Sequence, residues 1–368
     1  MAFAVPKTKG KPKAAGREPK LAARERKGDA PKGIHRKQQA APSRRTALEE
    51  KNEQCPNKDD VKESTTLDAP LCVIKSPSQV NVFPSAAEPE KRDYPGGDDP
   101  FMCVEYKDAI IANLLEQERA RHYVISERFL LNVQRAITPR MRAILVNWLT
   151  TVHVHFKLLP ETFQMAIDLL DRVLQVRPVS KDRFQLVGVT CVHVAAKYEE
   201  VYPPTIDDYA EITDNAYTIK DILREEVDVL KTLHYRVSRP LTITFLRQLS
   251  VESCANCIEH AMAKFVVDVA MMDATAATLL PSRRAAAALR LAEHMLAMGG
   301  ARRRTFDFRR ALRILGDEAE VTREIEEAVV VLRRTLRYYR ESKLHAAFDK
   351  YANATGHYVS RHDSVSAV

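Results

Sequence analysis

Residues 138–200, TPRMRAILVNWLTTVHVHFKLLPETFQMAIDLLDRVLQVRPVSKDRFQLVGVTCVHVAAKYEE, decide the fold. Thr138 is a favourable N-cap, and Pro139 suits the first position of a helix because the N–H that it lacks would have no partner there. Apolar residues then recur at intervals of three and four, which predicts a helix with one apolar face. This stripe consists of Met141, Ile144, Leu145, Trp148 and Val152.

Breaks at Pro160 and at residues 178–180 separate this helix from two more. The segment 185–196 is apolar nearly all round, which suits a buried central helix; its Val and Thr content also suits a strand, but its length favours helix. Thr205-Ile-Asp-Asp208 and Thr218-Ile-Lys-Asp221 resemble capping boxes with Asp in place of Glu, and each predicts the start of another helix. Residues 138–238 therefore form a first unit of five helices.

A second series of helical patterns follows Arg239-Pro240. Its five segments are LTITFLRQL, IEHAMAKFVVDVAMM, PSRRAAAALRLAEHML, FRRALRIL and TREIEEAVVVLRRTLRYYR. We predict an all-α fold of tandem five-helix units at 138–238 and 239–350, with a C-terminal tail at 351–368. Apolar residues near helical spacing in VEYKDAIIANLLEQERARH predict a helical region at 104–137 before them.

The first hundred residues differ in composition from the rest. Residues 1–45 hold 14 Lys and Arg against 3 Asp and Glu, whereas the whole chain has a net charge of only +8. The basic character therefore belongs to residues 1–100, a tail with no sustained apolar period that we expect to be disordered. No signal peptide or membrane span is visible, and six scattered cysteines form no secreted disulfide framework. We expect a soluble, intracellular protein.

Four segments carry a resemblance to a known family. MRAILVNWL (141–149), FKLLPETFQMAIDLLDRVLQ (156–175), VSKDRFQLVGVTCVHVAAKYEEVYPP (179–204) and TDNAYTIKDILREEVDVLKTLHYRVSRPLTITFLRQ (213–248) resemble the first cyclin box, most closely that of B-type mitotic cyclins. PSRRAAAALRLA and KLHAAFDKYANATGHYVS resemble parts of the second box. The resemblance implies a non-catalytic regulatory subunit without a cofactor, which binds and activates a mitotic cyclin-dependent protein kinase and drives entry into mitosis.

Four charged residues, Arg142, Asp171, Lys197 and Glu226, stand in otherwise apolar helices, where an unpaired charge is costly. From the residues alone all four can be structural ion pairs. The resemblance implies that Arg142 pairs with Asp171, and that Lys197 and Glu226 hydrogen-bond the backbone of the kinase's mobile C-helix region. Tyr198 and Tyr235 lie at positions where the family packs aromatic side chains against the kinase.

The apolar stripe of the first helix has a second interpretation besides core packing. Met141, Ile144, Leu145 and Trp148, with Gln185, match the family's hydrophobic patch, which takes short docking motifs of substrates and inhibitors. Such a patch must be partly exposed. Asn147 and Thr151 stand where the family usually has acidic residues, so we expect weaker attraction for the basic end of a docking motif.

Arg247, His260 and Lys264 are either an ordinary solvated basic face or a binding site. His260 and Lys264 are four residues apart and share a helix face. Mitotic B-type cyclins have an Arg, a His and a Lys at matching positions, which bind the phosphate of phosphorylated partners. Protonation of His260 in the usual histidine range would then strengthen binding.

Arg45-Thr-Ala-Leu48 in the tail resembles the core of a destruction box, which a mitotic ubiquitin ligase reads. The match is incomplete, since Glu49 replaces the usual Gly. The basic runs Lys7–Lys13 and Arg24–Lys27 suit either a nuclear import signal or a generic charged tail. We expect the protein in both nucleus and cytoplasm.

Other classes of protein fit less well. Cys254-x-x-Cys257 with His260, or His153 with His155, would make a poor metal site, because the CxxC has no second pair and residues two apart point away from each other on a helix. No catalytic motif is visible. Some transcription factors share a tandem five-helix fold and bind nucleic acid, but the near-neutral folded part argues against direct nucleic-acid binding, and nothing points to a membrane.

Overall fold

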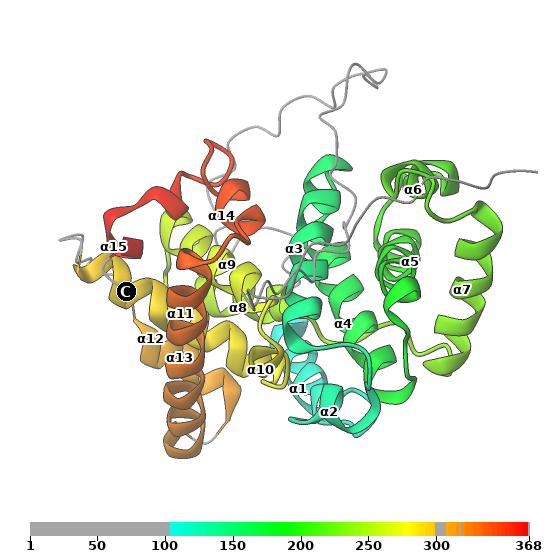
Figure 1. The fold of residues 1–368 in the computed structure, drawn as a ribbon. Helices are drawn as coiled ribbons and strands as arrows, with labels where there is room; N and C mark the ends of the chain where they lie inside the picture. The colour runs from blue at the N-terminus through cyan, green and yellow to red at the C-terminus, as the bar shows by residue number, and fades with distance from the viewer. Residues whose placement is uncertain (1–103, 299–306, 317, 367–368) are drawn as a thin grey trace, which may run out of the picture. The chain divides into compact units, whose positions relative to one another are not determined.

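Helices make up all of the regular structure in the described part of the chain, residues 104–298, 307–316 and 318–366 of a computed structural model (Figure 1). A 3₁₀ turn at Val104–Tyr106 leads into α1 (Lys107–Glu118), and α2 (Phe129–Val133) follows. The expected N-terminal helical region thus holds two helices. Within the described ranges no strand occurs, so the predicted all-α class is confirmed.

The first repeat has the five predicted helices. They are α3 (Pro139–His155), α4 (Pro160–Val176), α5 (Lys181–Glu199), α6 (Ile206–Ile212) and α7 (Ile219–Thr232). Thr138 caps α3 by accepting the Met141 N–H at 3.2 Å. Thr205 with Asp208 opens α6 and Thr218 with Asp221 opens α7, each as a complete capping box.

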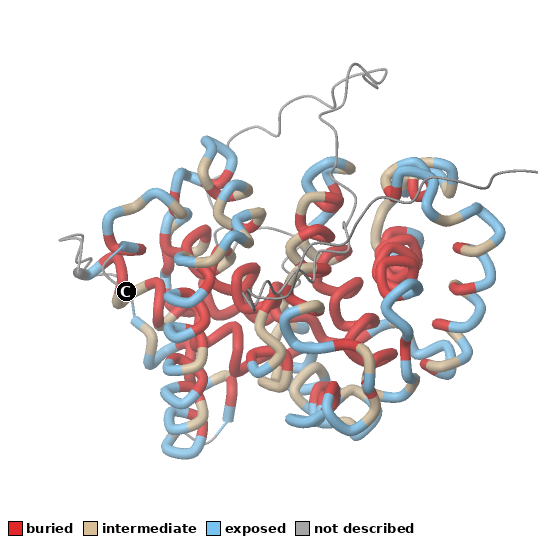
Figure 2. Tube along the Cα trace, in the orientation of Figure 1, coloured by how far each residue is buried: buried red, intermediate tan, exposed pale blue. Residues whose placement is uncertain are grey.

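Helix α5 is the centre of the first repeat. Every residue from Phe184 to Ala196 is buried, and the helix contacts α3, α4, α6 and α7. Figure 2 shows α5 coloured as buried along most of its length, whereas α7 has an exposed outer side. A segment surrounded by helices needs apolar residues all round, which explains why periodicity alone left helix and strand hard to separate.

The second repeat is built in the same way around α11. Its elements are α8 (Thr242–Glu252), α9 (Cys257–Ala270), α10 (Ala274–Ala277), α11 (Pro281–Met298), α12 (Phe308–Leu312), a 3₁₀ turn (Arg313–Leu315) and α13 (Glu318–Glu341). Helix α11 contacts α8, α9 and α13, and its four alanines at 285–288 are fully buried. Small side chains at these positions let the neighbouring helices approach closely.

Residues after α13 also pack onto the second repeat. They form α14 (Ala346–Lys350), a 3₁₀ turn (Val359–Arg361) and α15 (Asp363–Ser366). Tyr351, Val359 and Val365 are buried, and α15 contacts α11. The segment 351–366, which we expected to be a tail, therefore belongs to the packed structure.

Helix α1, near the start of the described chain, is bonded to the second repeat. Glu118, at its C-terminal end, is fully buried and accepts hydrogen bonds from the Ser282 N–H at 2.9 Å and the Ser282 hydroxyl at 2.6 Å. This carboxylate satisfies donors at the start of α11 that would otherwise have no intrahelical partner. Helix α1 is thus part of the support of the second repeat's central helix.

Candidate functional site

Arg142 and Asp171 form a buried ion pair between α3 and α4. The Arg142 Nε and Nη2 atoms donate to the two oxygens of Asp171 at 2.5 Å and 2.6 Å. Arg142 Nη1 also donates to the carbonyl oxygens of Met271 and Met272, at 2.9 Å and 3.2 Å, at the end of α9. The pair that the resemblance implied therefore also ties the first repeat to the second.

Lys197 at the end of α5 and Glu226 on α7 meet at the surface. The Lys197 ammonium donates to Glu226 Oε1, and His193 Nε2 lies 3.5 Å from Glu226 Oε2. The Lys197 side chain is 42% exposed and that of Glu226 only 13%. Burial lowers the pKa of His193, so the imidazole tends to be neutral beside this pair. The two residues partner each other here and remain within reach of a bound protein.

Apolar side chains are exposed around the Lys197–Glu226 pair. Ile219, Leu223 and Val227 are exposed at intervals of four along α7, and Glu226 follows Leu223 by three residues, on the same side. Tyr198 on α5 is 56% exposed, and Tyr235, just after α7, is 67% exposed. An exposed apolar stripe beside a charged pair is typical of a protein-binding surface.

The five residues of the candidate docking patch are unequally exposed. Met141 and Ile144 are half-buried, whereas Leu145, Trp148 and Gln185 are buried. Helices α3 and α5 approach closely here, because a Cβ atom added at Gly188 would meet Leu145 Cδ2 at 3.0 Å. The stripe therefore belongs mainly to the core, and only Met141 and Ile144 reach the outside.

Two donors of the patch are unused. Trp148 Nε1 and Gln185 Nε2 are buried and have no hydrogen-bond partner among the described residues. A buried donor without an acceptor is costly, so each of these two groups lacks a contact that the described residues do not supply.

Asn147 and Thr151, next to the patch, have structural partners instead of acidic character. Asn147 Oδ1 accepts the Ala346 N–H at 3.0 Å, which holds the start of α14 against α3. The Thr151 hydroxyl donates to the Asn147 carbonyl at 3.4 Å. The Asn147 amide thus fixes an element of the second repeat.

Arg247, His260 and Lys264 lie close enough for their charges to act on one another. Arg247 and Lys264 both lower the pKa of His260, although burial is the larger cause, and together they bring it to about 3. Burial also lowers the pKa of Lys264. His260 Nδ1 lies 2.9 Å from the Ser250 hydroxyl, and Arg247 pairs with Glu161 at the start of α4.

The sequence allowed either a solvated basic face or a phosphate site in which His260 has a usual histidine pKa. The burial of the cluster differs from the first interpretation, and the pKa of His260 differs from the second. The cluster is not a solvated face, because His260 and Lys264 are both half-buried or more. The expectation that His260 charges in the usual histidine range does not hold for the unliganded chain, since its pKa lies at about 3. The sequence pattern also gave no sign of Glu161 or Ser250, because both contacts arise from packing between helices.

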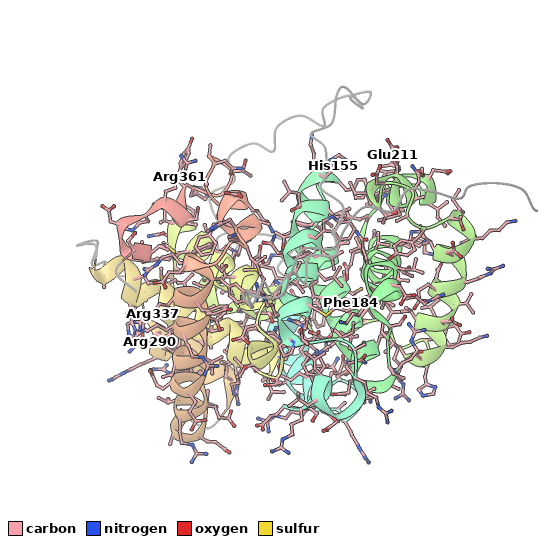
Figure 3. The ribbon with its side chains drawn as sticks, in the orientation of Figure 1. His155, Phe184, Glu211, Arg290, Arg337 and Arg361 are labelled. Carbon is pink, nitrogen blue, oxygen red and sulfur yellow. The ribbon has the colours of Figure 1, made fainter. Side chains whose placement is uncertain are left out.

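The candidate metal ligands do not come together. His153 is buried, while His155 at the end of α3 points outward. Figure 3 shows His155 at the surface, whereas the labelled Phe184 lies in the interior. Cys254 and Cys257 are exposed free thiols. Among the described residues, no group of three or more His, Cys, Asp or Glu side chains could hold a metal ion. None of the described helices is both long enough and apolar enough to cross a membrane.

Comparison with known proteins identifies both repeats. Residues 109–238 match the family described as Cyclin, N-terminal domain, and residues 240–365 match Cyclin, C-terminal domain. A viral cyclin from herpesvirus saimiri, with 19% sequence identity, covers 61% of this chain and 99% of its own with a TM-score of 0.51. That structure shares the fold.

Three curated relatives are mitotic cyclins. G2/mitotic-specific cyclin-B2 of Rana japonica is 42% identical over 207 residues, which are 56% of this chain and 52% of the relative. Cyclin-B of Arbacia punctulata is 39% identical over 57% of this chain and 51% of its own length, and human cyclin-B2 is 40% identical over 55% and 50%. The chain spans about half the length of the curated relatives it matches. With N- and C-terminal cyclin domains together spanning most of its length, the chain belongs to the cyclin family.

Proposed function

We propose that this chain is a non-catalytic regulatory subunit, which binds and activates a cyclin-dependent protein kinase of the mitotic type. One observation carries the proposal: the exposed apolar stripe of α7 lies beside the Lys197–Glu226 pair. A free surface of this kind is costly in water and becomes favourable when a partner covers it. The mitotic assignment is supported by the relatives, which are named as G2/mitotic-specific cyclins.

Activation follows if the cyclin binds the active form of the kinase better than the inactive form. Lys197 has spare ammonium donors, and the Glu226 carboxylate can accept further hydrogen bonds besides its contacts with Lys197 and His193, so both can bind backbone groups of the kinase's C-helix region. Tyr198 and Tyr235 add aromatic contact area around these polar groups. The pair would thus bind the C-helix region only when the C-helix is in the position that phosphoryl transfer requires.

The Lys197→Ala/Glu226→Ala double variant tests this proposal. It should remain folded but lose about 2–5 kcal/mol of kinase binding, as charged groups at other interfaces do. Calorimetry gives the affinity, and histone phosphorylation gives the activation. The matched control is Arg290→Ala/Glu293→Ala, which removes an ion pair of the second repeat. Activation by the first variant at the wild-type concentration would show that the surface is assigned wrongly.

In this proposal, substrates and inhibitors bind to the candidate docking patch on α3 and α5. Met141 and Ile144 offer apolar contact to a docking motif, while the unused donors of Trp148 and Gln185 can bind its backbone. Trp148→Phe removes the indole donor and keeps a large ring. It should weaken binding of a docking peptide and leave kinase activation unchanged, and a fluorescence titration measures the first effect.

Phosphorylated partners are proposed to bind the cluster of Arg247, His260 and Lys264. The charges of Arg247 and Lys264 both act on His260, so the three side chains are close enough to donate hydrogen bonds to one phosphate. A phosphothreonine peptide should bind more tightly than its unphosphorylated form, and the difference should shrink at high salt. Equal affinities in calorimetry, or no effect of Arg247→Ala, would sink the idea.

Control by proteolysis and nuclear import is proposed for the tail. Arg45, Leu48 and the basic runs before them lie outside the described residues. Arg45→Ala/Leu48→Ala should lengthen the half-life in mitotic extract if a mitotic ubiquitin ligase reads this segment. An unchanged half-life would place the degradation signal elsewhere. Deletion of Lys7–Lys13 should shift a tagged protein from nucleus to cytoplasm.

A further inference from the structure

A small cavity lies between the two cyclin boxes. It has a volume of about 30 Å³, which is more than the 10–15 Å³ that one water molecule needs. The polar side chains that line it belong to both boxes and to the connection between them. They are Gln164, Asp168, Asp171, Arg239, Thr242 and Arg284.

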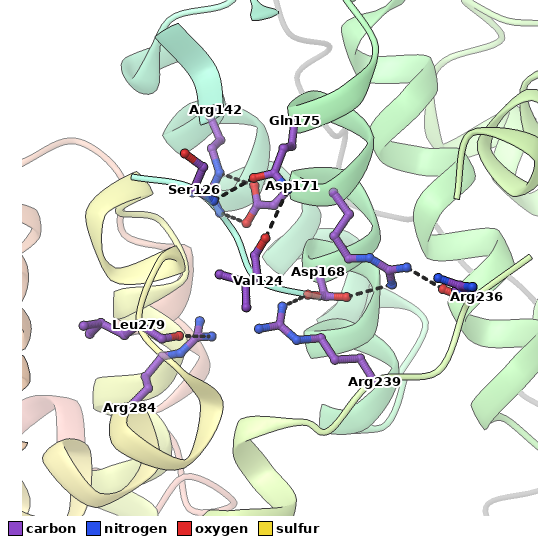
Figure 4. A network of polar contacts seen from close by, with 11 residues as sticks. Val124, Ser126, Arg142, Asp168, Asp171, Gln175, Arg236, Arg239, Leu279 and Arg284 are labelled. Atoms are coloured by element: carbon purple, nitrogen blue, oxygen red, sulfur yellow. Dashed lines mark hydrogen bonds and ion pairs between the residues drawn. The ribbon is translucent and has the colours of Figure 1, made fainter. Parts of the chain in front are cut away.

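Both carboxylates of this cavity already accept hydrogen bonds from guanidinium groups. Asp168 accepts from Arg239 with one oxygen and from Arg172 with the other, at 3.2 Å. Both oxygens of Asp171 accept from Arg142. Figure 4 shows the Asp168 and Asp171 contacts as two separate groups of hydrogen bonds, with Arg284 bonded to neither. Each of the four carboxylate oxygens thus already accepts from a guanidinium group, and neither carboxylate is hydrogen-bonded to a fourth one.

Arg284 is that fourth group. The residue is 9% exposed, and its side chain donates a long hydrogen bond of 3.4 Å from Nη2 to the Leu279 carbonyl. Its Nε is buried without a partner among the described residues, and the same holds for Nε of Arg239. Burial lowers the pKa of Arg284 to about 10, so the side chain is still charged at neutral pH. A buried charge of this kind needs a counter-charge.

Glu118, the next carboxylate, does not supply it. Both of its oxygens accept from Ser282, burial raises its pKa, and the arginines that act on it are Arg283 and Arg239 and not Arg284. The remaining polar groups of the cavity are donors as well. Gln164 uses its oxygen to accept the Ile243 N–H at 2.9 Å, so its amide NH₂ is left, together with the Thr242 hydroxyl. Apart from the Thr242 hydroxyl, which can donate or accept, the free polar groups of the cavity are donors, and such a cavity favours an anion.

We propose that this cavity binds a monovalent, halide-sized anion between the guanidinium groups of Arg239 and Arg284. In Figure 4 these two groups approach each other in the space between the first and second boxes. The small volume excludes larger anions such as nucleotides. Because Arg239 belongs to the connection and Arg284 to α11, the anion holds the two boxes together by supplying the counter-charge that Arg284 lacks.

Bromide is the probe for the test, because it scatters X-rays anomalously and resembles chloride in size. Crystals of the full chain soaked in sodium bromide should show an anomalous peak in the cavity, next to Arg239 and Arg284. In solution, bromide at about five times its dissociation constant should raise the melting temperature by about 2–4 °C over sodium gluconate of equal ionic strength. The rise should saturate with concentration, unlike a general salt effect.

Two variants separate the site from general effects of charge. Arg284→Met should abolish the bromide dependence, because it removes the unpaired guanidinium. Arg283→Met is the matched control, since the neighbouring Arg283 pairs with Glu324 at 2.6 Å and its loss should leave the bromide dependence intact. Equal melting temperatures of the wild-type chain in bromide and gluconate overturn the proposal, even if crystals show a peak. So does a water molecule at the site in bromide-soaked crystals.

Discussion

At the scale of single residues, His153 has a clear consequence for pH dependence. It is buried on α3 with its ring 5.0 Å from that of Phe163, and burial lowers its pKa from 6.5 to about 3. The unfolded chain therefore binds a proton more readily than the folded chain. Stability should fall as the pH drops from about 6.5 towards 3, by at most about 1.4 kcal/mol per pH unit from this group.

Urea unfolding at pH 7, 6 and 5 measures this effect. His153→Gln should unfold with a shallower pH dependence than the wild-type chain, whatever its stability at pH 7. His155→Gln, an exposed change two residues away on the same helix, should keep the wild-type dependence. Parallel curves for His153→Gln and the wild type would mean that other groups cause the acid sensitivity.

Glu161 would compete with a phosphate for Arg247 in the proposed binding site of Arg247, His260 and Lys264. Its carboxylate pairs with Arg247 in the unliganded chain, so a phosphate must displace it. Glu161→Gln should therefore tighten binding of a phosphothreonine peptide, by about two- to five-fold if the half-exposed pair is worth up to 1 kcal/mol. Calorimetry with wild type and variant measures the difference. Glu211→Gln, on the surface of α6, is the control, and weaker binding by Glu161→Gln would contradict the competition.

Residue roles were only partly predictable from the sequence. Charges isolated in apolar helices pointed to Arg142, Asp171, Lys197 and Glu226, because such charges need partners. The same signal was present in PSRRAAAALRLA, where Arg283 and Arg284 precede a run of alanines, but it does not say which of the two has a carboxylate partner. Partners that come from another helix, such as Glu161 for Arg247, depend on packing that no local pattern specifies.

At the scale of elements, helix starts were the most predictable feature. Thr138, Thr205 and Thr218 all cap helices as their sequences indicate, because capping depends on residues within one turn. The same pattern at Asn256 and Glu259 opens α9. Helices α10, α14 and α15 have only four or five residues, too few to show an apolar period, so they follow from tertiary packing.

The contact between α3 and α5 leads to a prediction about Gly188. A Cβ there meets the fully buried Leu145 at 3.0–3.3 Å, so Gly188→Val should overpack this contact and cost about 1–3 kcal/mol of stability. In a Leu145→Ala background the same change should cost less, because the obstructing side chain is gone. Denaturant unfolding of the four proteins gives the coupling energy. An equal cost in both backgrounds would show that Leu145 is not the obstruction.

At the scale of the whole described structure, Arg142 connects three helices from both boxes. Arg142→Met leaves Asp171 buried without its partner and should cost about 3–5 kcal/mol. Arg142→Met/Asp171→Leu should recover part of that loss but not all, because the carbonyls of Met271 and Met272 still lack a donor. Both boxes should unfold in one transition. A double variant less stable than Arg142→Met would contradict this account.

The bond between Glu118 and Ser282 also sets an order of events during synthesis on the ribosome. The two residues are 164 positions apart, and the whole first box lies between them. At about 5–20 residues per second, Glu118 waits roughly 8–30 s before Ser282 has even been made. The first helix in the described part of the chain is thus among the last to reach its final place. Until then the side of α1 that is buried in the folded chain remains exposed to solvent near the ribosome, where a chaperone can bind it.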